Sequence, residues 1–207
     1  MKYKFVDIGT SHFSTSVDIY GTDVDGILVE PIKEYLDVIP GSDRIIKANY
    51  AISNFNGDGF INANIPTGNI YYASESKMNE LKITNPNEES KIGRDGWGHL
   101  IPNVGLFQSG QIVCKIITFY KLCELYQIEE IEYLKIDTEG HDHIILEQVY
   151  DIMKQEKLII TDKIKFEYNF LANKQVLDIL AAKFRKDFGF KSQLIDKNNQ
   201  QDIILYR

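Results

Sequence analysis

The sequence predicts an α/β protein built on a doubly wound, mostly parallel β-sheet. Near the N-terminus, three short apolar and β-prone runs alternate with helical segments, and the links between them are short. The run Ile27-Leu28-Val29 is continuously apolar, as is typical of a parallel strand that is buried on both faces. Near the C-terminus, two β-prone runs flank a short polar turn, which predicts an antiparallel hairpin. This order of elements indicates the doubly wound class.

The first half of the chain contains three predicted strands with a helix between each pair. The strands are residues 3–8, 26–30 and 44–53, and the helices are residues 14–20 and 32–38. Gly9 ends the first strand, Pro31 follows the second, and Pro40-Gly41 closes the second helix.

The second half returns to regular alternation at Thr118. Apolar residues within 118–126 recur at positions i, i+3, i+4 and i+7, which predicts an amphipathic helix. The further predicted elements are strands at 131–136 and 163–168, helices at 143–154 and 176–188, and hairpin strands at 190–195 and 201–206.

Residues 54–110 interrupt this alternation, because they are rich in Asn, Gly, Ser and Tyr and show no regular period. A structureless loop of that length is unusual in a compact domain. We therefore expect short strands or turns that pack over the edge or mouth of the sheet. At about 150 residues per domain, the chain predicts one domain over residues 1–207, with 54–110 as an insertion.

Composition restricts the class of partner. The chain has 23 basic and 30 acidic residues, so its net charge is −7, and its pI is near 5.2. This balance disfavours nucleic acid and anionic membranes as partners. Apolar residues make up 43% and charged residues 26%, which argues against a disordered or fibrous chain.

Location is predicted to be cytoplasmic. No apolar run approaches the roughly 20 residues that span a bilayer. The first residues turn acidic at Asp7 and lack the apolar core of a signal peptide. Cys114 and Cys123 are too few for a disulfide framework, so we expect buried free thiols in a reducing compartment.

The first candidate site is Asp7-Ile8-Gly9-Thr10-Ser11, at the end of the first strand. Glycine lets the backbone approach a ligand closely, and the carboxyl ends of parallel strands form the usual ligand crevice. Dinucleotide binders use G-x-G-x-x-G, but Ser11 and Ser14 stand at the second and third glycine positions. This argues against NAD and FAD and favours a nucleoside without phosphates; an ordinary strand-to-helix turn is the alternative.

Glu30, at the end of the second strand, is the second candidate. It follows Gly9 by 21 positions (30 − 9), close to the spacing of about 20 at which an acid binds ribose hydroxyls. A carboxylate accepts two hydrogen bonds from a cis-diol with good geometry. The alternative is a surface acid that stabilises the following helix.

The third candidate is the segment Leu134–Asp142, where four ionisable groups crowd the end of the predicted central strand. Asp137, Glu139 and His141 alternate, so an extended chain would direct them to one side. Clustered charges at a strand's carboxyl end indicate a functional site, because they tune each other's pKa values. Simple capping of the next helix by acids is the alternative.

These motifs together resemble those of the FkbM-type S-adenosylmethionine-dependent methyltransferases. The matching segments, in order, are 5–10, 29–31, 49–53, 134–142 and 165–169. The block Lys-Ile-Asp-Thr-Glu-Gly at 135–140 is the most specific, and the others are common to many Rossmann-like methyltransferases. Two positions depart from the family, which usually has Asn where Ser11 stands and a second glycine where Phe13 stands.

The resemblance implies a seven-stranded Rossmann-like sheet with its last strand antiparallel, and S-adenosylmethionine as the cofactor. Its implied cofactor residues are Asp7, Gly9, Thr10 and Ser11 beside the methionine part, Glu30 at the ribose, Asn49 and Ala51 at the adenine, and Asp137 near the sulfonium. The implied reaction is methylation of a hydroxyl on a sugar, a glycan or a small molecule.

Removal of the acceptor's proton needs a base, and the candidates are Asp137, Glu139 and His141, with His99 as a more distant possibility. A carboxylate pair could instead hold a divalent metal that lowers the pKa of the hydroxyl. The inserted residues 54–110 would shape the acceptor site, and Tyr71, Tyr72 and Trp97 there either line it or pack in the core.

Two other functions stay open. A non-catalytic module that binds a nucleoside or nucleotide-sugar is favoured by the altered positions Ser11 and Phe13, whereas the acids Asp137 and Glu139 favour an enzyme. An NAD-dependent oxidoreductase is disfavoured by the missing glycines.

Overall fold

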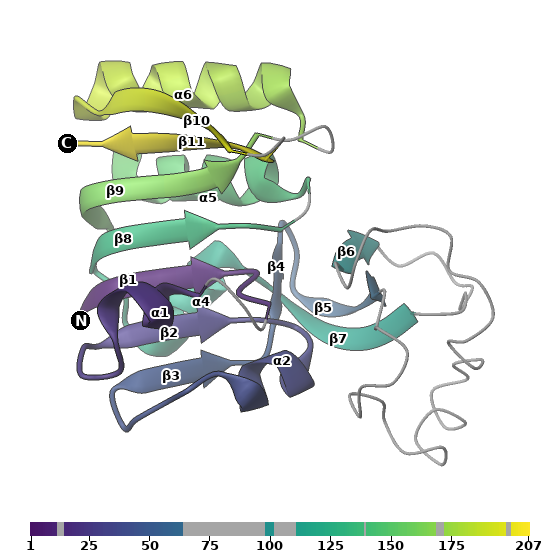
Figure 1. The fold of residues 1–207 in the computed structure, drawn as a ribbon. Helices are drawn as coiled ribbons and strands as arrows, with labels where there is room; N and C mark the ends of the chain where they lie inside the picture. Colours follow the sequence, from purple (N-terminus) through teal and green to yellow (C-terminus); the bar gives the residue numbers. More distant parts are fainter. Residues whose placement is uncertain (12–14, 64–97, 102–110, 139, 169–171, 198–199) are drawn as a thin grey trace, which may run out of the picture.

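A computed structural model gives the fold of the chain as two β-sheets with helices packed on the larger one (Figure 1). The structure describes residues 1–11, 15–63, 98–101, 111–138, 140–168, 172–197 and 200–207. The termini of the large sheet's strands carry most of the predicted site, so its topology decides which residues meet.

The large sheet has seven strands and confirms the predicted doubly wound class. Its order is β10 (Lys191–Lys197), β11 (Gln200–Tyr206), β9 (Ile159–Glu167), β8 (Glu130–Ile136), β1 (Lys2–Ile8), β2 (Gly26–Val29) and β3 (Ile45–Ala48). Strands β3, β2, β1, β8 and β9 are parallel to one another, and β11 is antiparallel to both β9 and β10. The predicted C-terminal hairpin is therefore confirmed.

Helices cover both faces of this sheet. One face carries α4 (Phe119–Tyr126), α5 (Asp142–Lys154) and α6 (Lys174–Phe188), and the other carries α1 (Ser16–Tyr20) and α2 (Lys33–Val38) (Figure 1). Strand β2 is buried on both faces, because Ile27 and Val29 pack toward the first set of helices and Leu28 toward the second. A continuously apolar strand is what such two-sided burial requires.

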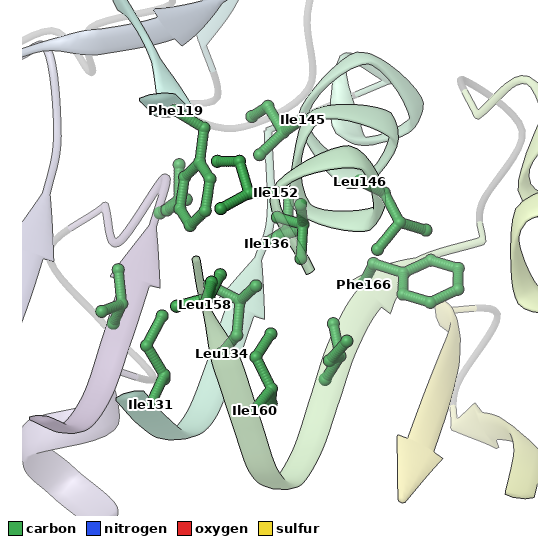
Figure 2. Close-up of a cluster of buried hydrophobic side chains, with 14 of the residues drawn as sticks. Phe119, Ile131, Leu134, Ile136, Ile145, Leu146, Ile152, Leu158, Ile160 and Phe166 are labelled. Atoms are coloured by element: carbon green, nitrogen blue, oxygen red, sulfur yellow. The ribbon is translucent and has the colours of Figure 1, made fainter. Parts of the chain in front are cut away.

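The main core lies between α4, α5 and the centre of the sheet. Figure 2 shows how Leu134 and Ile136 of β8 pack against Ile145 and Ile152 of α5, with Phe119 of α4 closing the cluster. All five side chains are at most 2% exposed. Full burial of a side chain of this size contributes about 1.5–3 kcal/mol, so this cluster is the main anchor of β8 and of the residues that follow it.

A second sheet of four strands differs from the prediction. Its order is β4 (Ala51–Ser53), β7 (Gln111–Thr118), β5 (Gly57–Ala63) and β6 (Gly98–Ile101). Strands β5 and β6 show that the segment 54–110 contains the short strands that were expected. Strand β7 was not predicted, because the sequence analysis assigned no element to residues 111–117.

The prediction of one strand over residues 44–53 is wrong. The run splits into β3, which pairs with β2, and β4, which pairs with β7 in the other sheet. The chain turns at Asn49 and Tyr50, where the Tyr50 N–H donates to the Ala48 carbonyl at 3.0 Å. Both halves are β-prone, so composition alone does not mark the break.

The prediction also placed the start of β9 four residues too late. Ile159 and Ile160 pair with the first residues of β8, and a register shift then accommodates the polar pair Thr161-Asp162. That irregularity hides the period-2 pattern from which a strand is recognised.

Two further expectations concern the cysteines and membrane spans. Cys114 is buried and Cys123 is half-buried, both as free thiols, and burial raises the pKa of each to about 12. Among the helices that the structure describes, none is long and apolar enough to cross a bilayer.

Candidate functional site

Three of the predicted site residues follow directly after three neighbouring strands. Strand β1 lies between β2 and β8, and its last residue, Ile8, pairs with Val29 of β2 and Ile136 of β8. The next residues along each chain segment are Gly9, Glu30 and Asp137. The parallel sheet therefore brings these three positions to one edge, as expected for a ligand crevice at strand carboxyl ends.

Gly9 is required by the main chain of Asp137. Gly9 adopts φ +75°, and a Cβ atom at this position would lie 1.9 Å from the Asp137 carbonyl oxygen. The Gly9 N–H donates to Val29 O at 2.9 Å, and the Asp137 N–H donates to Ile8 O at 2.9 Å. Glycine was predicted here for the approach of a ligand; the structure shows a contact between two loops that explains it without one.

Glu30 is buried, with 5% of its surface exposed, and both carboxylate oxygens accept main-chain hydrogen bonds. Oε2 accepts from the Ser11 N–H at 2.9 Å and Oε1 from the Ile32 N–H at 3.0 Å. Counting only donors in the described part of the chain, each oxygen accepts one hydrogen bond and can accept a second, so the carboxylate has acceptor capacity for a diol. Burial raises its pKa to about 7, although the two N–H donors oppose the shift.

Ser11 adopts a left-handed conformation, with φ +51°, which directs its N–H toward Glu30. Asn and Gly adopt this region more readily than Ser does. The turn after β1 therefore depends on the Glu30 carboxylate to hold a conformation that its own residue disfavours.

Asn49 and Ala51 were predicted to border the adenine, and the structure places Asn49 in the turn between β3 and β4 and Ala51 at the start of β4. The Asn49 side chain is exposed, and its Nδ2 donates to the carbonyls of Glu30 and Pro31, both at 2.9 Å. Ala51 is 5% exposed and packs in a small cluster with Ile32 and Cys114. Asn49 therefore joins the end of β2 to this turn, and an adenine contact stays a prediction for both residues.

Asp7 and Thr10 lie beneath the edge of the sheet. Asp7 is fully buried, and its Oδ2 accepts from the Ser16 N–H at 2.7 Å and from the Ser16 hydroxyl at 2.8 Å. Thr10 is 1% exposed, and its hydroxyl donates to the Ser11 carbonyl at 3.1 Å. Asp7 thus fixes the start of α1 to β1, and direct contact of either residue with a cofactor stays a prediction.

Lys135 is a buried residue to which the sequence analysis gave no role. Its ammonium lies 3.4 Å from Asp7 Oδ1 and 3.3 Å from Asp137 Oδ2, and its side chain is 5% exposed. The side chain of Asp137 is 32% exposed, so the acid reaches the surface while its ion-pair partner, Lys135, stays buried. The signal was present in the sequence, because a lysine inside an apolar strand and two residues before an acid needs a charged partner.

Asp142, the first residue of α5, organises the loop after β8. Its Oδ2 accepts from the Thr138 N–H at 3.2 Å and from the Thr138 hydroxyl at 2.8 Å, and its Oδ1 accepts from the Glu167 N–H at 3.0 Å. The residue is 1% exposed, and burial raises its pKa to about 7. Asp142 therefore ties the end of β9 to the loop that carries Asp137.

His141 contacts the second sheet. Its Nε2 lies 3.0 Å from the hydroxyl of Ser53 on β4. Burial, and then the neighbouring His143, lower the pKa of His141 to about 4, so the ring is neutral at pH 7. A neutral imidazole can accept a hydrogen bond or a proton, which keeps His141 among the candidate bases.

Gln148 fixes the same corner from within α5. Its amide donates to the Ser53 carbonyl at 2.9 Å, and its carbonyl oxygen accepts from the Phe119 N–H at 2.9 Å. The residue joins α5 to both β4 and α4, and it was not singled out from the sequence.

Several predicted residues cannot be placed in the site. Glu139, Phe13, Tyr71, Tyr72 and Trp97 lie outside the described residues. His99 falls on β6 of the second sheet, and its side chain is not described. Within the described ranges, no group of three or more His, Cys, Asp or Glu side chains is arranged to hold a metal ion.

The fold and the acids along its edge define the class of Rossmann-like methyltransferases. The family model described as the methyltransferase FkbM domain matches residues 7–192 of the chain. The chain therefore belongs to the FkbM methyltransferase family, which confirms the resemblance. No curated protein and no solved structure matches the chain.

Proposed function

We propose that the protein is an S-adenosylmethionine-dependent methyltransferase that methylates a hydroxyl group on a sugar, a glycan or a small molecule. The observation that carries the proposal is the pair Glu30 and Asp137 on either side of the Gly9 turn, at the carboxyl ends of three adjacent strands. Family membership supplies the reaction class, and this geometry supports the cofactor.

The chemistry of the two acids fits a sulfonium nucleoside. Glu30 is buried, and each of its carboxylate oxygens has one hydrogen-bond donor among the described residues, which leaves acceptor capacity for the paired hydroxyls of a ribose. Asp137 is partly exposed and suits a cationic group by charge. A cofactor with a diol at one end and a positive charge at the other matches both residues.

When bound, S-adenosylmethionine supplies a methyl group on a positively charged sulfur. The protein's contribution is to align the acceptor hydroxyl with that carbon, and alignment accounts for about 7–11 kcal/mol in favourable cases. A positioned base adds roughly 10²–10⁴-fold by taking the hydroxyl proton. Asp137, Glu139 and His141 are our candidates for this role.

Calorimetric titration tests the cofactor directly. We expect the protein to bind S-adenosylmethionine and S-adenosylhomocysteine but not NAD. Binding of NAD with no binding of either sulfur nucleotide would refute the proposal. A screen of glycans and small alcohols for uptake of labelled methyl then identifies the acceptor.

Turnover tests the enzymatic part separately. An Asp137→Asn variant that transfers methyl groups at the normal rate would remove this carboxylate from the mechanism. Cofactor binding without methyl transfer to any acceptor in the screen would favour the nucleoside-binding module instead.

A further inference from the structure

We propose that Lys135 is a positioning residue that holds the Asp137 carboxylate in the direction of the cofactor's charged sulfur. The inference rests on the proposed function, because it concerns the way in which Asp137 meets S-adenosylmethionine. It adds a residue that acts through Asp137 and does not itself reach the surface.

The geometry starts from the pairing of two strands. Asp7 and Lys135 are direct partners across the β1–β8 ladder, and Asp137 follows Lys135 by two positions, directly after the end of β8. The ammonium lies between the two carboxylates, at 3.4 Å from Asp7 Oδ1 and 3.3 Å from Asp137 Oδ2. Because Asp7 is held by Ser16 at the start of α1, the ammonium has a fixed anchor on its inner side.

The charges make Lys135 necessary to both acids. Asp7 Oδ1 is buried and accepts no hydrogen bond from the described residues, so the Lys135 ammonium is its compensating charge. Burial works to lower the pKa of Lys135, but attraction by Asp7 and Asp137 outweighs it and raises the pKa above its ordinary value. Asp137 is the member of this group that reaches the edge of the sheet.

Without Lys135, two carboxylates would share one site with no cation between them. Asp137 Oδ2 would lose the ammonium that lies 3.3 Å from it, and no other group in the described part of the chain would hold the carboxylate in its present direction. A ligand with a positive charge at this end should then bind less tightly, while a ligand without that charge binds as before. This difference between two ligands distinguishes a positioning role from a purely structural one.

Other titratable groups surround Lys135, Asp7 and Asp137, and the measurement must separate their effect on affinity from that of Asp137. They are Tyr133 on β8, Glu30 after β2, Asp142 at the start of α5, and Lys165, the partner of Lys135 on β9, which pairs with Asp202 at 2.7 Å. S-adenosylmethionine and S-adenosylhomocysteine share the ribose and adenine and differ at the sulfur. The ratio of their affinities therefore cancels groups that act on the ribose, Glu30 above all.

The experiment measures this affinity ratio by calorimetry at one pH near neutrality. Lys135→Met is made alone and in an Asp7→Asn background, where no buried carboxylate loses its cation and folding is protected. Lys135→Arg, which retains the positive charge, is the matched control, and Asp137→Asn removes the group on which Lys135 acts.

We expect Lys135→Arg to have the wild-type affinity ratio within about twofold. Both Lys135→Met proteins should have an affinity ratio about three- to tenfold less favourable to S-adenosylmethionine, because Asp137 is no longer held toward its positive charge. Asp137→Asn should have a similarly low ratio. A wild-type ratio in the Lys135→Met proteins, or in Asp137→Asn, overturns the inference. Failure of the wild type to bind either nucleotide would instead refute the proposed function.

Discussion

The carbonyl oxygen of Asp137 occupies the space that a Cβ atom on residue 9 would need, with only 1.9 Å between the two positions. This contact joins the turn after β1 to the loop after β8. Those are the two segments to which we assign the methionine part of the cofactor and the acceptor. Contact between the main chains of Gly9 and Asp137 therefore fixes the distance between the proposed cofactor-binding turn and the loop that carries the proposed base.

Gly9→Ala should destabilise the protein strongly, because the new methyl group would collide with Asp137 O while φ stays at +75°. We expect a loss of about 2–5 kcal/mol in the free energy of unfolding, measured by urea denaturation. Gly189→Ala is the matched control: Gly189 has the same φ of +75°, but a Cβ there has no atom within 4 Å. It should cost only about 1–2 kcal/mol. Equal losses in the two variants would contradict this account of Gly9.

The fold class was predictable because the central strands carry their own signal. Strand β2 is buried on both faces and reads as a continuous apolar run, and the hairpin strands flank a polar turn. The second sheet was not predictable in the same way. Its strand β4 follows β3 after a turn of two residues, Asn49 and Tyr50, whose side chains do not exclude a strand.

The sequence predicted which residues of the candidate site lie at the carboxyl ends of the strands. Gly9, Glu30 and Asp137 were placed together because parallel strands align their carboxyl ends. The sequence did not predict the buried hydrogen bonds and ion pairs beneath the site. Asp7 accepts hydrogen bonds from Ser16, and Lys135 forms ion pairs with Asp7 and Asp137. Gln148 joins α5 to β4 and α4. These contacts join positions that are distant in the chain, or depend on side chains turning inward, and a linear motif records neither.

Glu30→Gln tests the proposed ribose contact. The substitution preserves size but removes the charge and places an amide beside two main-chain donors, the N–H groups of Ser11 and Ile32. We expect the affinity for S-adenosylhomocysteine to fall about 10- to 100-fold in calorimetry, since hydrogen bonds to a charged group contribute about 1.5–3 kcal/mol. Asp37→Asn on the exposed side of α2 is the control and should bind as the wild type does. Unchanged affinity in Glu30→Gln would remove this residue from the site.

Gln148→Leu should destabilise the protein by removing the hydrogen bonds that join α5 to the second sheet and to α4. Leucine fills similar space but leaves the Ser53 carbonyl and the Phe119 N–H without the partner that each has now. An unpaired buried polar group costs about 1–3 kcal/mol, so we expect a total loss of roughly 2–4 kcal/mol in urea denaturation. Glu147→Ala, at the neighbouring exposed position, should change stability by less than about 0.5 kcal/mol. A Gln148→Leu protein as stable as the wild type would show that these hydrogen bonds contribute little.

Asp142→Asn should reduce the dependence of stability on pH. The pKa of Asp142 is raised from 3.8 to about 7 by burial, so between these values the folded state holds a proton that the unfolded state releases. Its contribution to stability is complete below pH 3.8 and is lost as the pH rises through 7. The asparagine cannot titrate, so the decline in the free energy of unfolding from pH 5 to pH 8 should be smaller by about 1–3 kcal/mol.

Urea denaturation at several pH values checks this, with Asp151→Asn on the exposed side of α5 as the control. Glu30, whose pKa is also raised to about 7, contributes the same decline to every variant and cancels in the comparison. Asparagine also loses one of the acceptors for Thr138 and Glu167, so the variant should be less stable at every pH. The slope, and not the absolute stability, therefore decides the prediction: a slope equal to that of the wild type would mean that Asp142 is already ionised in the folded protein at pH 5.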